Sequence, residues 1–327
     1  MVIFHGEIVT FTGQSTYRDK IIHMRRILLG LIIISIFNNC SEKEKLTLDQ
    51  EIQKLGDSIQ IFTVTLGKTD TIVANNGTRL IIRPNTFMFN DGQDTKEPIQ
   101  IELKEIFDKS DMILSGLGTL SDGRLIESFG MIYLSATFDG KELKLKENSS
   151  IAVSIPNKRK GDAGELFYGV QTNSIVNWKY ASTTNDTTEV VEAYTQLPDE
   201  GGGKFELPIF YEFEIKNLGW INCDRFIEIT DKVDLEIELK TSNHAIGYLI
   251  FADINSVIQL TFNEKGIAIV ENLPKDYSAD VIVIDKIDKT CMWTKQNLKI
   301  GVKSKVTLET RKINEEELKT ELKSLDQ

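Results

Sequence analysis

Residue types that commonly carry out chemistry are sparse in this chain. Beyond residue 40 the only histidine is His244, in a turn-like stretch where we expect a solvated loop position. The sequence has neither paired histidines nor a CxxC spacing, the patterns that would indicate a zinc site. GxSxG, Walker and GxGxxG motifs are also missing from the sequence. We therefore expect no metal and no cofactor.

Carboxylates are the abundant reactive groups. Glu105, Asp108, Asp111 and Glu127 fall in a turn-rich stretch, and two carboxylates about 5 to 10 Å apart can hydrolyse a glycosidic bond. Such clusters also arise by chance in so acidic a chain. Residues 90–94 (NDGQD) offer oxygen ligands without the spacing of an EF-hand, which favours a solvated hairpin. We expect no catalytic residue, with a carboxylate-based hydrolase as the alternative.

Aromatic side chains are candidate ligand contacts. Trp178 has Tyr180 two residues later and Tyr168 ten residues earlier, and exposed aromatic patches mark interaction surfaces. These three residues are the candidates for stacking on a sugar or a peptide, although burial of Trp178 is equally open. For Trp220, inside an apolar run, we expect a core position.

A short apolar segment near the N-terminus indicates export. Residues 24–40 (MRRILLGLIIISIFNNC) combine two arginines, a predominantly apolar region of 11 residues and Cys40. The apolar run is too short to span a bilayer, which needs about 20 residues, but fits a secretory signal. A polar run, SEKEK, follows Cys40. A start assigned too far upstream, with Met24 as the real initiator, would explain residues 1–23, and the choice between Met1 and Met24 stays open. We exclude residues 1–39, an upstream extension and signal peptide, from the fold.

This segment resembles the lipobox signal of bacterial lipoproteins. Asn38 and Asn39 replace the small residues usual before the cysteine, and the looser form with acidic residues after the cysteine is similar to exported lipoproteins of the Bacteroidota. The resemblance implies lipidation of Cys40 and a lipid-anchored, surface-exposed place on the outer membrane of the cell envelope. An uncleaved anchor or cleavage by the ordinary signal peptidase is the alternative.

The remaining cysteines, Cys223 and Cys291, both lie in the C-terminal half. An exported chain can form disulfides, so a bridge and two free thiols are both open. Each cysteine has a tryptophan nearby, Trp220 and Trp293 respectively, which leads us to expect both thiols near one core.

Residues 40–327 carry a net charge of −13, and such an acidic chain repels nucleic acid. Their length predicts about two domains. Period-two alternation over residues 99–103 and 131–138 predicts half-buried strands, and Asp139-Gly140 predicts a hairpin turn. Asn-Gly and Asp-Gly turns recur between such strands, which is typical of a β-sandwich.

The expected fold is all-β, with two β-sandwich domains in tandem after a lipoprotein signal, and a short C-terminal helix. The chain divides in sequence as follows: a polar tether at 40–57, a sandwich at 58–180, a linker at 181–204, a second sandwich at 205–312 and a helix at 313–327. Asn314 is the expected helix cap.

Two stretches resemble known modules. Residues 76–87 (NGTRLIIRPNTF), followed by the alternating strand 99–105, resemble the β-sandwich module of zona-occludens proteins and netrin receptors. Residues 109–132 and 218–226 are similar to segments of uncharacterised exported Bacteroidota proteins. Residues 265–274 (KGIAIVENLP) are similar to transthyretin-like sandwiches. These resemblances imply an architecture and a compartment, and no catalytic residues.

The sequence thus predicts a non-enzymatic lipid-anchored surface protein that acts in binding, adhesion or assembly of an envelope complex. The expected partners are the membrane, through the anchor, and a protein or glycan. A glycan-active hydrolase or accessory protein using carboxylates, and a purely structural spacer, are the alternatives.

Overall fold

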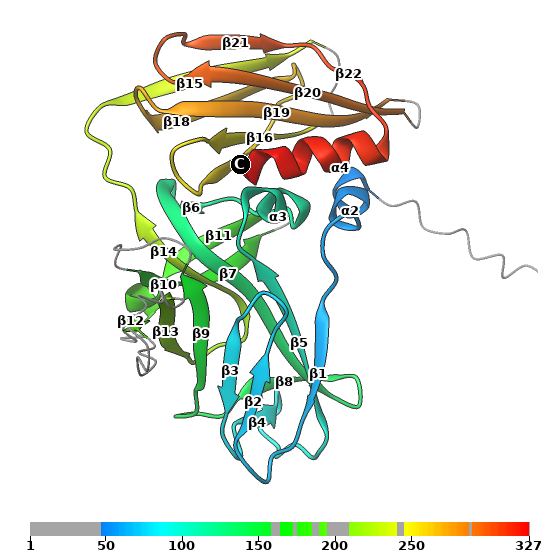
Figure 1. The fold of residues 1–327 in the computed structure, drawn as a ribbon, viewed down its shortest axis with the longest axis vertical. Coiled ribbons are helices and arrows are strands. Elements are labelled where there is room, and N and C mark those ends of the chain that lie inside the picture. The colour runs from blue at the N-terminus through cyan, green and yellow to red at the C-terminus, as the bar shows by residue number, and fades with distance from the viewer. Residues whose placement is uncertain are drawn as a thin grey trace, which may run out of the picture. The chain divides into compact units, whose positions relative to one another are not determined.

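Strands joined by tight turns make up most of the chain in the computed structural model, which describes residues 47–157, 164–172, 175–184, 190–194, 209–240, 245–287 and 290–326. The fold is all-β, as the sequence predicts (Figure 1). Residues from Thr47 onward form one compact unit. Cys40 and His244 lie outside the described residues. In the described part of the chain, no helix is both long enough and apolar enough to span a membrane.

The elements follow one another in this order: α2 (Leu48–Gln53), β1 (Gln60–Val64), β2 (Asp70–Val73), β3 (Arg79–Ile82), β4 (Phe87–Phe89), β5 (Ile99–Ile106), α3 (Lys109–Leu114), β6 (Leu120–Ser121), β7 (Arg124–Phe138), β8 (Lys141–Leu145), β9 (Ile151–Asn157), β10 (Glu165–Thr172), β11 (Ile175–Tyr180), η1 (Ala181–Thr184), β12 (Val191–Tyr194), β13 (Ile209–Ile215), β14 (Gly219–Phe226), β15 (Lys232–Leu239), β16 (Ile246–Phe251), β17 (Val257–Leu260), β18 (Ile267–Pro274), β19 (Ser278–Ile287), β20 (Thr290–Lys299), β21 (Lys305–Leu308), β22 (Arg311–Lys312), α4 (Glu315–Lys323) and η2 (Ser324–Asp326).

Asp-Gly pairs shape both ends of the long strand β7. Asp139 and Gly140 have φ of 49° and 71°, and they join β7 to β8 with Phe138 opposite Lys141. Asp122 and Gly123, with φ of 50° and 79°, make the equivalent turn from β6. Two successive residues with positive φ match the twist of a two-residue hairpin, so the predicted hairpin at Asp139-Gly140 is confirmed.

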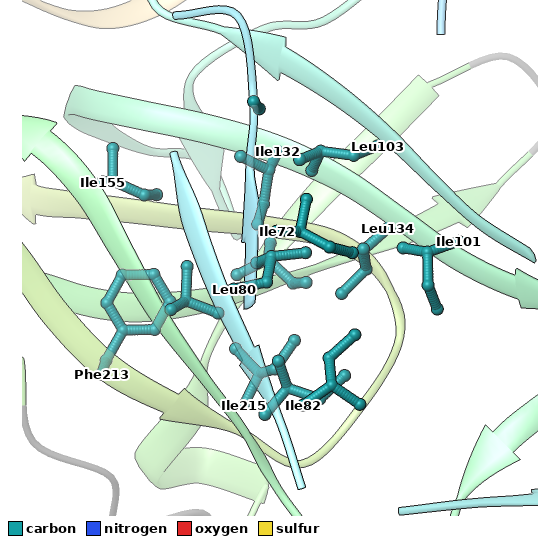
Figure 2. Packing of buried hydrophobic residues seen from close by; sticks show 14 of the residues in the cluster. Ile72, Leu80, Ile82, Ile101, Leu103, Ile132, Leu134, Ile155, Phe213 and Ile215 are labelled. Atoms are coloured by element: carbon teal, nitrogen blue, oxygen red, sulfur yellow. The ribbon is translucent and has the colours of Figure 1, made fainter. Parts of the chain in front are cut away.

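Two sheets form the N-terminal sandwich. The large sheet has the order β1-β5-β7-β14-β10-β11, with β4, β6 and β8 attached, and the small sheet has the order β12-β13-β9-β3-β2. Alternate side chains from β5 and β7 meet those from β3, β9 and β13 in the N-terminal core (Figure 2). Leu80, Leu103, Ile132 and Ile215 are fully buried there. The alternation in the sequence follows from this packing, because one face of each strand points into the core.

Two further sheets form the C-terminal sandwich. The outer sheet has the order β18-β15-β21, and the inner sheet has the order β17-β16-β19-β20-β22. Residues such as Leu235, Leu249 and Val281 fill the C-terminal core between these sheets. The other face of the inner sheet carries Tyr248, Ile282 and other members of a separate cluster. Strands β16 and β19 are consequently buried on both sides.

That separate cluster, the junction core, joins the two sandwiches. It combines Ile282 and Trp293 of the inner sheet with Phe167 and Trp178 of the large sheet. Helices α2, α3 and α4 contribute further residues, namely Ile52, Met112, Ile113, Leu114, Leu318 and Leu322. Asn314 caps α4 by accepting a hydrogen bond from Glu317 N at 2.9 Å, as expected. The helices therefore close the apolar face that the strands leave open.

Strand pairing corrects two expected boundaries. We expected a linker over 181–204 and a second sandwich from residue 205. Instead β12 and β13 pair within the small sheet, and β14 pairs with β7 in the large sheet. The C-terminal sandwich therefore starts only after Phe226. The stretch expected as a tether over 40–57 contains a short helix, which the polar sequence of residues 46–56 had left open, and Ile52 of this helix, α2, lies in the junction core.

Candidate functional site

Two of the carboxylates singled out in the sequence hold loops and strands together. Glu105 is 4% exposed and accepts hydrogen bonds from Thr78 N (2.9 Å), Asn76 N (2.8 Å) and Gln60 Nε2 (3.0 Å). These bonds tie the turn between β2 and β3 to β5. A carboxylate whose oxygens accept hydrogen bonds from backbone donors stabilises the turn that supplies them, and no substrate can replace those donors without opening the turn.

Glu127 links the two sandwiches. Its Oε2 accepts hydrogen bonds from Arg225 Nε (3.0 Å) and Nη2 (2.7 Å), and its Oε1 accepts from Asn255 N at 3.2 Å. Asn255 Nδ2 donates in turn to Phe107 O and Ser128 O, both at 3.0 Å. The side chain of Glu127 is almost fully buried. Arg225 lies opposite Glu127 on the neighbouring strand β14 of the same sheet, whereas Asn255 belongs to the C-terminal sandwich, so the bond from Asn255 N leads us to assign Glu127 to domain attachment.

A buried acid that the sequence did not single out lies next to Glu127. Asp224 is fully buried in β14, and its Oδ2 accepts a hydrogen bond from Asn222 Nδ2. Asn222 Oδ1 accepts from Ser128 Oγ at 3.0 Å. Burial raises the pKa of Asp224 well above its usual value, and the nearby Glu127 charge adds to this rise. The fold therefore favours the neutral form of this acid.

Asp108 and Asp111 border a groove of about 540 Å³ beside α3. Asp57 and Asp326 also line it, together with Lys319 and Lys323. Burial raises the pKa of Asp111, and the charges of Asp108 and Asp57 raise it further. Asp326 is otherwise engaged, since it accepts hydrogen bonds from Ser110 N (2.9 Å) and Ser110 Oγ (2.6 Å).

The aromatic trio does not form a stacking platform. Trp178 is 0% exposed, and its Nε1 donates to Gly118 O at 2.7 Å. Tyr168 is also buried, but in the N-terminal core, because neighbouring strands place it and Trp178 on opposite faces of the large sheet. Tyr180 is half-buried against Phe167 and Phe226. All three candidates therefore serve packing, and Trp220, expected in a core, is half-buried and packs at the edge of the junction core.

The two cysteines are free and lie in different clusters. Cys223 is buried in the N-terminal core, whereas Cys291 packs at the edge of the junction core. The expectation of a shared core was wrong because Trp220 and Cys223 are three positions apart on one strand, which places their side chains on opposite faces. Burial raises the pKa of both thiols, so neither is activated as a nucleophile.

The segment at residues 90–94 forms a turn, as expected. Asp91 Oδ1 accepts a hydrogen bond from Gln93 N at 3.0 Å, and Asp94 pairs with Lys146 at 2.6 Å. Among the described residues, no group of histidine, cysteine or acidic side chains has an arrangement suited to a metal ion.

The open face of the inner sheet holds a polar groove of about 700 Å³, which we call the α4 groove. Its sheet residues follow from strand register. Asp280 of β19 lies opposite Asn297 of β20, and Lys295 lies two positions away on the same face. Trp293, further along that face, is buried in the junction core. The face thus changes from apolar to polar where the cover provided by α4 ends.

The charges of the α4 groove are paired. Lys295 lies 3.4 Å from Asp280, whose other oxygen accepts from Asn297 Nδ2 at 3.1 Å. Arg311 and Glu321 pair at 3.1 Å across the edge of α4. Glu309 pairs with Lys240 on the outer sheet. Thr310 adds a buried hydroxyl oxygen for which the structure shows no partner. The remaining lining residue is Thr294.

This arrangement favours binding over covalent chemistry. Each acid in the α4 groove is paired with a cation, so the groove offers fixed hydrogen-bond donors and acceptors with little unpaired charge. Sequence reasoning missed it because its residues come from β19, β20, β22 with the segment before it, and α4. One sequence pattern could have indicated the groove: the polar residues Lys295 and Asn297 follow Trp293 at alternate positions, on the same face of a strand.

Comparisons with protein-family models, with curated proteins and with solved structures found no match to this chain.

Proposed function

We propose that this protein is a lipid-anchored, non-enzymatic binding protein of the outer envelope surface, with the α4 groove as its ligand contact. The single observation that carries the binding role is the groove itself, where donors and acceptors are held in place by three ion pairs. The engagement of Glu105 and Glu127 in structural bonds adds support. The anchor rests on the sequence around Cys40.

The paired charges also indicate the kind of ligand. A groove whose charges are satisfied internally does not select strongly for an ion, and its amide, hydroxyl and carboxylate groups suit the hydroxyl groups of a glycan or the backbone of a peptide. Both belong to the partner classes expected from the sequence.

The anchor is tested by feeding cells a palmitate analogue. Wild type should be labelled and Cys40→Ala should not, because the thiol is the acceptor. Equal labelling of the two proteins contradicts lipidation at this residue.

The groove is tested by comparing two double variants. Asp280→Ala with Arg311→Ala removes one partner from each of two groove ion pairs. Glu238→Ala with Lys305→Ala removes an ion pair at 3.2 Å on the outer sheet and serves as the matched control. Binding to arrayed glycans and to envelope proteins cross-linked in cells should fall only in the groove variant. Equal binding by both variants rules out the groove, and no binding by wild type favours a structural spacer.

A carboxylate hydrolase is the second candidate, favoured by the raised pKa of Asp111 beside Asp108 and Asp57. An acid with a raised pKa beside a second carboxylate is the arrangement used in glycoside hydrolysis. Turnover of a glycoside panel that disappears in Asp111→Asn would establish this candidate. Under the leading proposal, wild type and Asp111→Asn both match buffer.

A further inference from the structure

Helix α2 is the point at which the N-terminal segment becomes fixed to the folded unit. Thr47 and Gln50 form a reciprocal capping box at its start. Ile52 is 4% exposed in the junction core. Glu51 accepts a hydrogen bond from Lys286 Nζ of β19 at 2.6 Å. A six-residue helix is not stable alone in water, so these contacts hold it in place.

The residues after α2 extend this attachment. Leu55 packs on the junction core, and a Cβ added at Gly56 would lie 3.1 Å from Leu114 Cβ of α3. On its other side, α2 shares a small apolar pocket with Leu318 of α4. Residues 47–56 therefore move with the body of the protein.

The chain between this fixed point and the proposed anchor is short. Six residues separate Cys40 from Thr47, so their Cα atoms can be at most about 24 Å apart. A folded unit the size of Thr47–Gln327 has a radius of gyration of roughly 19 Å. Even fully extended, the tether is shorter than the diameter of the body it holds, so the body cannot turn its far side to the bilayer.

We infer that the surface formed by α2 and the adjoining N-terminal end of α4 lies against the lipid bilayer. This inference rests on the proposed lipidation of Cys40. The surface carries Asp49, Glu51, Lys286 and Glu315. Because acids outnumber bases there, contact comes from the tether and does not require anionic lipid.

The same geometry sets the distance between the α4 groove and the membrane surface. Glu315 and Leu318 of α4 border the pocket shared with α2, whereas Glu321 lines the groove. One helix, about 10 Å across, therefore separates the membrane-facing side from the ligand-facing side. The ligand must accordingly be one that occurs close to the membrane surface.

The test compares two exposed lysines in the lipidated full-length protein. Lys54 follows α2, whereas Lys141 lies at the far end of β7. The 15 residues of β7 extend about 45 Å away from the junction. Each lysine is replaced by cysteine in a Cys291→Ser background, labelled with a donor fluorophore and bound to phosphatidylcholine vesicles that contain acceptor lipid. Energy transfer from Lys54→Cys should exceed that from Lys141→Cys by roughly two-fold or more.

The control lengthens the tether. Inserting about 20 Gly and Ser residues after Lys45 raises the maximum reach of the tether to about 90 Å, more than the diameter of the body, and the ratio of the two transfer signals should then fall toward one. Equal transfer from both sites with the native tether overturns the orientation while leaving the anchor intact. Failure of wild type to bind vesicles, with no palmitate label, overturns the anchor and the orientation together.

Discussion

The outer and inner sheets of the C-terminal sandwich are built from different sequence patterns. In the outer sheet, β18 alternates, and Ile269 is 63% exposed. In the inner sheet, all six residues of β16 are buried. An alternating strand has one face in water, and a continuous apolar strand has both faces covered. The difference shows that the inner sheet is a middle layer, completed on one side by the outer sheet and on the other by the junction core.

Separating the two sandwiches should have the largest effect. A fragment of residues 228–327 would expose Tyr248, Ile282 and Trp293, each 1% exposed or less in the whole chain. Burial of one such side chain is worth about 1.5 to 3 kcal/mol. We expect this fragment to aggregate or to bind a hydrophobic dye, while the chain from Thr47 onward unfolds in one calorimetric transition. A fragment that is monomeric and cooperatively folded would show that the junction core is dispensable.

Single substitutions should distinguish the two sheets. Ile282→Ala in the inner sheet should destabilise the protein by about 2 to 5 kcal/mol, because it leaves a cavity in the junction core. Ile269→Ala on the exposed face of the outer sheet should change stability by no more than about 0.5 kcal/mol. Urea denaturation of both variants gives the values, and similar losses would contradict the layer assignment.

The polar part of the junction can be tested in the same way. Arg225→Ala leaves Glu127 buried without its guanidinium partner, and we expect a loss of about 3 kcal/mol. The matched control is Arg83→Ala, which breaks the exposed pair with Glu214 and should cost at most about 1 kcal/mol. If thermal unfolding shows equal losses, Glu127 does not depend on Arg225 for its place in the junction.

Asp224 should show the smallest effect and the clearest pH dependence. Its pKa is raised in the folded state by burial, above an unfolded value of about 3.9. The folded state therefore binds the proton more tightly, and its stability falls as pH rises from the unfolded pKa to the folded one. Asp224→Asn removes this loss, so its melting temperature relative to wild type should increase from pH 4 to pH 8. A constant difference contradicts the neutral buried acid.

Local patterns were sufficient to predict much of the fold. The alternating strand at 99–103, the Asp139-Gly140 turn and the Asn314 cap depend on contacts between near neighbours. The predicted domain boundary at residue 205 was wrong because β13 and β14 pair with strands that come much earlier in the chain. Alternation of apolar and polar residues identifies a strand but does not specify its partner strand. The apolar run of β16 is typical of burial on both faces, which the expectation of two sandwiches in tandem did not take into account.

The site was harder to predict than the fold. Glu127 was singled out for its chemistry, but only the structure places Arg225 and Asn255 beside it. Trp178 and Tyr168 are two strand neighbours that face opposite cores, which depends on register. The α4 groove combines Asp280, Arg311 and Glu321 from separate elements, so no short motif could have predicted it.

The pairing of early residues with late ones has a consequence for how the chain folds. Ser110 is bonded to Asp326, 216 positions later, and Glu51 to Lys286, 235 positions later. Contacts between residues so distant in sequence form slowly, because a long loop must close first. We expect the N-terminal sandwich to acquire its strands early and α2 to dock last. Ribosome-bound chains would therefore expose the junction face until α4 has been synthesised and α2 has docked, which makes that interval the most vulnerable to aggregation.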